Sequence, residues 1–291
     1  MMSKLIKAFR KTLTITIFAY LFYFIVRIVI SSILKEDDMN FHMTSLLGYI
    51  IAGPSIWGTG HLWYLVAYLE TLLITLFLVW SRSLKLVWIL IPLGLIVNMI
   101  VGVYGFILPL PSDLNIDDIF RVMLSRNFFT IGIPAFSIGL IIRKYNQAII
   151  QFVSKQYIWI IFVLLMLLSM IEFIALFRFY SSALPGDALI STTPLAACAV
   201  IICLHYKDFG SNSIFETIGK KYSTDIYIYH MFVRLVIVKI VVALLNRVSG
   251  YNYEFMYSAI IIFFATLIFV IIWQKSISYA KNILHIKSAK I

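Results

Sequence analysis

Long apolar segments, each about the length of a membrane-spanning helix, recur along the whole of this 291-residue chain. A helix of about 20 apolar residues crosses the roughly 30 Å of hydrocarbon in a bilayer. The expected spanning helices are Thr12–Leu34, His61–Trp80, Leu86–Leu108, Phe128–Ile142, Tyr157–Phe177, Ala188–Leu204, Tyr222–Leu245 and Phe255–Trp273. The shorter apolar piece Met43–Ala52 cannot span, and we expect it to be re-entrant or interfacial. The sequence therefore predicts an all-α fold, a polytopic transmembrane bundle of about eight helices that forms a single domain over residues 1–291.

The composition also favours a membrane protein over a soluble one. Hydrophobic residues make up 62% of the chain, charged residues only 13%, and the mean hydropathy is +0.97. A soluble domain of this length has too little interior for so much apolar surface, whereas a membrane protein exposes it to lipid. The two cysteines lie within an apolar run, so we expect neither a disulfide framework nor a thiolate metal site, and no metal cofactor.

The formal net charge of +11 comes from lysines and arginines that fall mostly in alternate loops. Short loops rich in lysine and arginine stay on the cytoplasmic side of a membrane. This bias predicts a multi-pass protein of the cell (plasma or inner) membrane with both termini in the cytoplasm. The charge is thus explained by topology. Membrane lipid is an expected partner, and nucleic acid is not.

Two carboxylates, Glu70 and Glu172, lie deep within apolar sequence. A charged side chain at the centre of a lone spanning helix costs about 2.5–3.5 kcal/mol on the insertion scale, so we expect both to face the bundle interior. There each could take part in a functional site. Each could equally serve as a packing partner for an arginine or a tyrosine hydroxyl, and the sequence leaves both readings open.

His230 and Arg234 lie one helical turn apart and so share a face of the helix predicted over residues 222–245. Together they could bind an anion or assist a proton transfer. His230 could also be a neutral imidazole that is hydrogen-bonded to a neighbouring helix.

His61, Trp63 and Tyr64 begin the second predicted helix, where the chain enters the bilayer. Aromatic rings favour this interface, so His61 is either an interfacial anchor or a group that meets an acceptor at the outer mouth of the bundle.

Arg126 and Asn127 stand at the outer end of the fourth predicted helix, which contains Gly132, Pro134 and Gly139. Glycines allow close helix approach, and a proline frees a backbone carbonyl within the membrane. Arg126 could hold an anionic sugar or an acyl group, or it could only extend to the headgroups.

Several of these stretches together resemble acyltransferase family 3, the integral membrane O-acyltransferases that modify cell-surface glycans. The family's His-Leu-Trp-Phe/Tyr-Leu signature is similar to His61-Leu62-Trp63-Tyr64-Leu65, and its Arg-Asn helix resembles Arg126-Asn127-Phe128-Phe129. Glu172 matches an acid in the following helix, and the segment 222–230 resembles the late Ser-x-x-x-Ile-Tyr-x-x-His pattern.

The resemblance implies an O-acyltransferase, with acetyl the expected group, that moves an acyl group from acyl-CoA to a surface polysaccharide or its lipid-linked precursor. It implies that the cytoplasmic donor meets the acceptor on or near the outer side. The expected catalytic residues are His61, Glu70, Glu172 and His230. The expected substrate-binding residues are Arg126, Asn127, Trp63, Tyr64, Arg10, Lys11 and Arg234, with Arg10 and Lys11 similar to a family loop that could contact the phosphates of coenzyme A.

The chain also departs from the family pattern at its start. Family members typically have ten helices, and the first carries an Arg/Lys-x10-His motif whose histidine is thought to be the catalytic base. No residue before Arg27 corresponds to that histidine, so we expect the chain to be N-terminally short relative to the family. Buried acids and arginines also suit a glycan or small-anion transporter without catalysis, or a non-catalytic partner of a larger enzyme.

Overall fold

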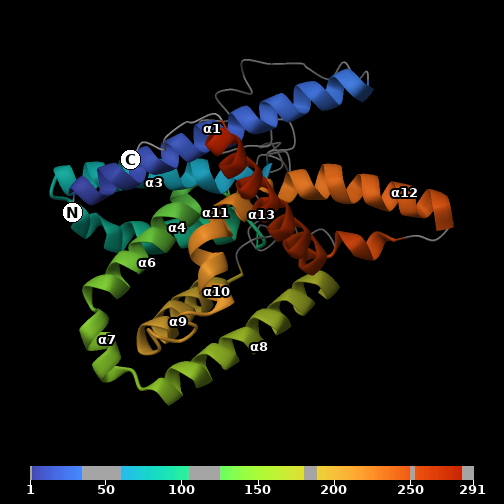
Figure 1. Cartoon of the computed structure of the whole chain (residues 1–291). Coiled ribbons are helices and arrows are strands. Elements are labelled where there is room, and N and C mark those ends of the chain that lie inside the picture. The colour runs from blue at the N-terminus through green and yellow to red at the C-terminus, as the bar shows by residue number, and fades with distance from the viewer. Residues whose placement is uncertain (1, 35–59, 105–124, 180–188, 250–252, 284–291) are drawn as a thin grey trace, which may run out of the picture. The chain divides into compact units, whose positions relative to one another are not determined.

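The computed structural model describes residues 2–34, 60–104, 125–179, 189–249 and 253–283, and its described residues are helical, without a strand (Figure 1). The chain divides into two compact units, Met1–Lys207 and Asp208–Ile291. The expectation of an all-α membrane protein is confirmed. The expectation of a single domain remains a prediction.

Unit 1 is built from seven described α-helices: α1 (Met2–Leu34), α3 (Trp63–Trp80), α4 (Val87–Val101), α6 (Ile133–Lys144), α7 (Asn146–Phe152), α8 (Lys155–Phe179) and α9 (Thr192–His205). Three short helical turns precede some of them: η2 (Gly60–Leu62), η3 (Leu84–Leu86) and the π-helical η4 (Phe128–Gly132). Unit 2 contains α10 (Ile214–Thr217), the π-helical η5 (Ile218–Tyr222), α11 (Ser223–Phe232), the π-helical η6 (Val233–Val238), α12 (Lys239–Ser249), η7 (Glu254–Tyr257) and α13 (Ala259–Ile283).

Six described helices are long and apolar enough to cross a membrane: Met2–Val26, Trp63–Trp80, Leu84–Val101, Lys155–Leu176, Ile214–Ser249 and Ala259–Tyr279. A seventh span results if Phe128–Lys144 and Asn146–Phe152, which meet at a 73° bend, are taken as one broken span. The sixth predicted span is the helix α9, which has 14 residues and is shorter than a spanning helix usually is. Each predicted span therefore corresponds to a helix over most of its described residues, but the count of eight is not confirmed.

The helix ends differ from the predicted ones in several places. α1 begins at Met2, ten residues before the predicted start, so Arg10 and Lys11 lie within the helix. Lysine and arginine are good helix formers, so a charged segment that ends an apolar run need not end a helix. The predicted Leu86–Leu108 ends at Val101, and Met43–Ala52 lies outside the described residues.

Within unit 1, α1 packs against α3, α4 against α6, and α8 along α9. The turn η4 packs against both α3 and α4. Gly132 at the end of η4 makes the closest approach: a Cβ placed there would overlap Thr71 Oγ1 and lie 3.2 Å from the backbone oxygen of Ala67. Small residues at such crossings let helix backbones approach, which is how helices associate in lipid.

Hydroxyl groups in the apolar helices bond to the backbone of the preceding turn. Thr16 Oγ1 donates to the carbonyl of Thr12 at 2.8 Å, and Thr71 Oγ1 donates to that of Ala67 at 2.7 Å. In unit 2, Thr266 does the same toward Ile262 at 2.6 Å. These bonds let a polar side chain lie in a spanning helix without a partner on another helix.

Unit 2 is held by packing of α11 and η6 against α13. Val233, Val238 and Val242 form its buried cluster, which aromatic residues of α13 and the preceding turn surround. Gln274 Nε2 of α13 donates to Asp225 Oδ2 of α11 at 2.6 Å, so this acid has its partner on the facing helix.

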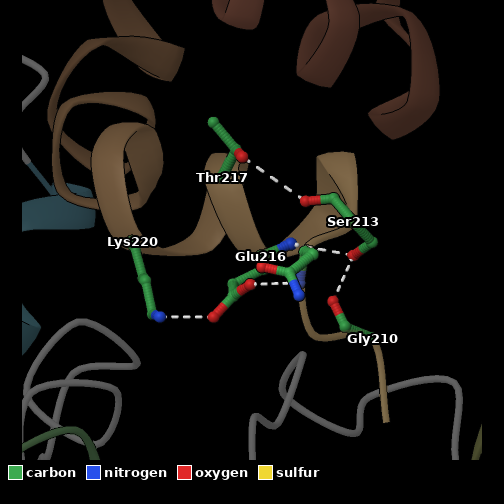
Figure 2. A network of polar contacts seen from close by, with 6 residues as sticks. Gly210, Ser213, Glu216, Thr217 and Lys220 are labelled. Atoms are coloured by element: carbon green, nitrogen blue, oxygen red, sulfur yellow. Dashed lines mark hydrogen bonds and ion pairs between the residues drawn. The ribbon is translucent and has the colours of Figure 1, made fainter. Parts of the chain in front are cut away.

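The first helix of unit 2 has a side-chain cap at its start. Ser213 Oγ accepts from the Glu216 backbone N–H at 3.2 Å, and Glu216 accepts from the Asn212 N–H at 2.6 Å (Figure 2). Glu216 also pairs with Lys220 one turn later (Figure 2). The cap satisfies donors that the first turn of a helix leaves open.

We predict that Gly132→Ala destabilises the protein, because the added methyl group meets the Thr71 side chain and the Ala67 carbonyl. Overpacking of this kind costs about 1–3 kcal/mol. The readout is the thermal unfolding of the purified protein in detergent.

The matched control is Gly139→Ala in α6, which directly follows η4, where a Cβ would meet nothing within 4 Å. Alanine is the better helix former, so this change should be neutral or stabilising by up to about 1 kcal/mol. Equal unfolding temperatures for the two variants would contradict the close approach at Gly132.

Candidate functional site

His61 lies in the short turn η2, just before α3, and its ring meets a tyrosine of α1. The centroids of the His61 and Tyr23 rings are 5.0 Å apart, at an interplanar angle of 69°. His61 is half-buried, its Nδ1 atom is buried, and the next residue, Leu62, is fully buried. The buried leucine and the tyrosine contact together fix His61 at the beginning of α3.

A row of aromatic rings continues from His61 along α3 and reaches α6. Trp63 meets Tyr64 edge-on with centroids 6.1 Å apart, and Tyr64 stacks with Tyr68 at 6.0 Å and 2°. Tyr68 in turn contacts Phe136 of α6 at 6.3 Å. Tyr64 is 49% exposed. We call Trp63, Tyr64, Tyr68 and Phe136 the aromatic row. It combines apolar ring faces with two phenolic hydroxyls.

The pair Arg126 and Asn127 begins the turn η4, and the structure explains the asparagine. Asn127 Oδ1 accepts from the N–H groups of Phe129 at 2.8 Å and Thr130 at 3.1 Å. The Asn127 backbone carbonyl accepts from the next two N–H groups, at 3.1 and 3.3 Å. The Asn127 side chain thus satisfies two of the open donors at the start of this helix, and its carbonyl accepts the first backbone bonds of the helix.

The same turn is fastened to α4 by a buried asparagine. Asn98 Nδ2 donates to the Ser125 carbonyl at 2.6 Å, and Thr130 Oγ1 donates to that carbonyl at 3.0 Å. Arg126 lies between these fixed residues and is half-buried. The backbone of Arg126 is therefore held in place on both sides, which suits a side chain that has to meet a ligand at a defined position.

Glu70 lies in the middle of α3, next to Thr71, and is half-buried. Among the described residues, no hydrogen bond or ion pair to its carboxylate is found. This contrasts with Glu172 and Asp225, whose carboxylates are bonded to neighbouring elements. A carboxylate in a spanning helix without such a partner is a candidate for function.

The Glu172 carboxylate of α8 accepts hydrogen bonds from the residues at the beginning of α9. Its Oε1 accepts from the Ile190 N–H at 2.8 Å, and its Oε2 accepts from the Ser191 hydroxyl at 2.6 Å and the Ser191 N–H at 3.3 Å. Ser169 Oγ lies 2.7 Å from Ser191 Oγ and extends this network. A carboxylate at a helix N-terminus is stabilised both by these bonds and by the helix dipole. Glu172 therefore caps the beginning of α9, and its expected catalytic role stays a prediction.

His230 and Arg234 belong to unit 2. His230 Nδ1 lies 2.7 Å from the Tyr227 carbonyl oxygen. A carbonyl can only accept, so Nδ1 carries the proton and Nε2 is the nitrogen that can accept one. Arg234 is exposed on η6. Because His61 and Arg126 lie in unit 1, the structure describes these two groups of site candidates separately.

The remaining candidates, Arg10 and Lys11, are both exposed on α1. In the part of the chain that the structure describes, no three histidine, cysteine or acidic side chains gather as metal ligands would. The described contacts thus bring His61, Trp63 and Tyr64 to one end of α3, and they attach Arg126 and Asn127 to the adjoining turn η4. Glu172 belongs to a separate contact between α8 and α9.

Sequence reasoning missed the partners Asn98, Ser169, Ser191 and Gln274. Each is an ordinary polar residue whose role depends on a helix that is distant in the sequence. The cap of α10 did have a signal, because Ser213-x-x-Glu216 has the spacing of a capping box.

We predict that Glu172→Ala lowers the free energy of unfolding by about 1–3 kcal/mol, because it removes the acceptor of the Ile190 and Ser191 donors. Glu172→Gln keeps one oxygen acceptor and should lose less. Thermal unfolding in detergent measures both, and an alanine variant as stable as the wild type would contradict the capping role.

A comparison of the sequence with protein families gives one match, to a family described as an acyltransferase domain, over residues 2–274. The matched range begins in α1, runs through both units and ends within α13. Searches of curated proteins and of solved structures gave no match. A family match over nearly the whole chain is decisive, and the chain belongs to acyltransferase family 3.

Proposed function

We propose that this protein is a membrane O-acyltransferase that moves an acyl group, with acetyl the simplest case, from acyl-CoA to a hydroxyl of a cell-surface polysaccharide or of its lipid-linked precursor. The observation that carries the proposal is the family match, which runs through α1, the aromatic row and η4 and into unit 2. The apolar helices support a membrane location for the reaction. The cell membrane and cytoplasmic termini are part of the proposal.

The reaction needs a base, an oxyanion donor and a place for each substrate. The sugar oxygen attacks the thioester carbonyl and its proton passes to the base. The carbon–sulfur bond then breaks, and the coenzyme A thiolate that leaves takes that proton from the base. A positioned base and a donor at the developing oxyanion each lower the barrier.

His61 is the proposed base. A neutral imidazole is the side chain best matched to proton transfer near neutral pH. The contact with Tyr23 and the buried Leu62 support this role, because they hold the imidazole in one place while the substrate arrives. His230 is the second candidate, since its Nε2 is the nitrogen that can accept a proton.

The acceptor sugar would lie along the aromatic row. Sugars present apolar C–H faces that pack on aromatic rings, and Trp63 and Tyr64 offer such rings beside His61. Arg126 would bind an anionic group of the sugar or the developing oxyanion, because a guanidinium gives planar paired hydrogen bonds. Asn127 would act mainly by holding η4 in shape.

The donor would be bound by other residues of the chain. Arg10 and Lys11 are exposed cations on α1 that would meet the phosphates of coenzyme A. Arg234, an exposed cation on η6 of unit 2, is a separate candidate for binding an anionic group. Glu70 would orient groups in the membrane layer, and Glu172 would act through the position of α9. This assignment requires no metal.

We predict that membranes containing the full chain transfer radiolabelled acetyl from acetyl-CoA to a glycan fraction, and that His61→Gln lowers the rate by about 100-fold or more. Glutamine keeps a polar side chain of similar reach but cannot act as a base at neutral pH. Counting of label in the glycan fraction, normalised to folded protein, gives the rate.

The control for this substitution is His205→Gln, which changes another half-buried histidine of unit 1 to which the proposal gives no role. It should keep the wild-type rate. Normal transfer by His61→Gln would remove His61 from the mechanism, whereas uptake of glycan without any acyl donor would favour a transporter.

We predict a different outcome for Glu70→Gln. The carboxylate has no hydrogen-bond or ion-pair partner among the described residues, so its neutral replacement should leave thermal stability unchanged or higher. Transfer should nevertheless fall by about tenfold or more if the charge orients a substrate or His61. Wild-type transfer combined with higher stability would show that Glu70 has no part in the reaction.

A further inference from the structure

The adjoining ends of α6, α8 and α9 in unit 1 carry a group of positive charges, of which Lys207 alone has an acid, Asp208, beside it in the sequence. The four cations are Arg143, Lys144, Lys155 and Lys207, and all four are exposed. Residues 128–171 and 189–207, which contain them, include no aspartate or glutamate. α9 contacts α6, α7 and α8, which brings these helix ends together.

Aromatic rings lie beside two of these lysines. Lys155 Nζ is 5.1 Å from the centroid of the Tyr206 ring, and Lys144 Nζ is 5.1 Å from that of Tyr145. Trp159 extends the first of these groups, with its ring 6.5 Å from Tyr206. Amphipathic rings of this kind concentrate at the headgroup level of a bilayer, where lysine side chains also extend their charge.

The short helix α7 connects the two groups of charge. The chain bends by 73° between Phe128–Lys144 and α7, and seven helical residues are only about 10 Å long. If α6 follows the membrane normal, α7 lies nearer the membrane plane. It ends at Phe152, which is 87% exposed, while Gln147 and Gln151 are also exposed. Figure 1 shows α7 between α6 and the beginning of α8.

We propose that this surface, made by Arg143, Lys144, Phe152, Lys155 and Tyr206, is an anchor for anionic phospholipid at the membrane interface. We call it the α7 surface. The ligand is the phosphate-bearing headgroup of an acidic phospholipid in the surrounding bilayer. Its acyl chains would meet Phe152, and its phosphate would meet the lysines, which bind phosphate as compact point charges. This binding is separate from the proposed acyl transfer.

Lys220 of unit 2 provides a matched contrast. It is 77% exposed, but its charge is balanced by Glu216 one turn away. The lysines of the α7 surface have no such acid near them in the sequence. Exposure alone therefore does not distinguish the two sets of lysines, whereas the absence of acidic neighbours does.

The test titrates the purified full chain in detergent with phosphatidylglycerol, with phosphatidylcholine or with coenzyme A, and follows the thermal unfolding temperature. We expect phosphatidylglycerol to raise this temperature and phosphatidylcholine to leave it unchanged. The double variant Lys144→Gln/Lys155→Gln should need about 20- to 30-fold more phosphatidylglycerol for half of the effect, because each lysine near an anionic surface contributes about fivefold.

The charge-preserving variant Lys144→Arg/Lys155→Arg should keep the wild-type response, and so should Lys220→Gln. An unchanged response of the double glutamine variant would overturn the proposal. Equal stabilisation by phosphatidylcholine would also overturn it. A third contrary result would be stabilisation by coenzyme A that is seen with the wild type and the double arginine variant but is lost in the double glutamine variant. None of these readouts depends on acyl transfer, so failure here is distinguishable from failure of the proposed function.

Discussion

Hydrocarbon offers no hydrogen bonds, and this constraint explains most of the polar side chains that the structure describes. Each buried polar group in a spanning helix has to find a partner within the protein. Threonines such as Thr71 and Thr266 use the preceding turn of their own helix. Asn98, Glu172 and Asp225 use a neighbouring element instead, and in doing so they fix which helices lie together. Packing in this protein is therefore specified by polar contacts as well as by shape.

The same constraint separates structural groups from functional candidates. Glu172 is fully engaged in capping α9, and Asn127 is fully engaged in capping η4, so their first role is to hold other residues in place. Glu70 has no hydrogen-bond or ion-pair partner among the described residues, and its half-buried position in α3 remains unexplained by packing alone. His61 lies at the beginning of that helix beside the aromatic row. The segment from His61 to Glu70 thus contains the polar side chains that are the strongest candidates for a catalytic role.

The sequence predicted the helices well because apolar length is a local property. It predicted the aromatic start of α3 for the same reason. The bend after α6 was not predicted, since the predicted helix ended at Ile142 and the polar residues Arg143–Gln147 gave no sign that a second helix follows at an angle. The pairing of Glu172 with Ser191 could not be predicted either, because helical periodicity shows that a residue faces inward but not which helix it meets. The π-helical turns η4, η5 and η6 likewise have no reliable local signal.

In the proposed reaction, polar side chains among the membrane helices bring a donor on one side of the membrane together with an acceptor on the other. Proteoliposomes with labelled acetyl-CoA outside and the glycan acceptor sealed inside, or the reverse, test it most directly. We expect labelled glycan in vesicles whose protein presents its donor side to the acetyl-CoA, and no labelled glycan in protein-free vesicles. Labelling only when donor and acceptor share one compartment would show that this protein does not transfer an acyl group across the membrane.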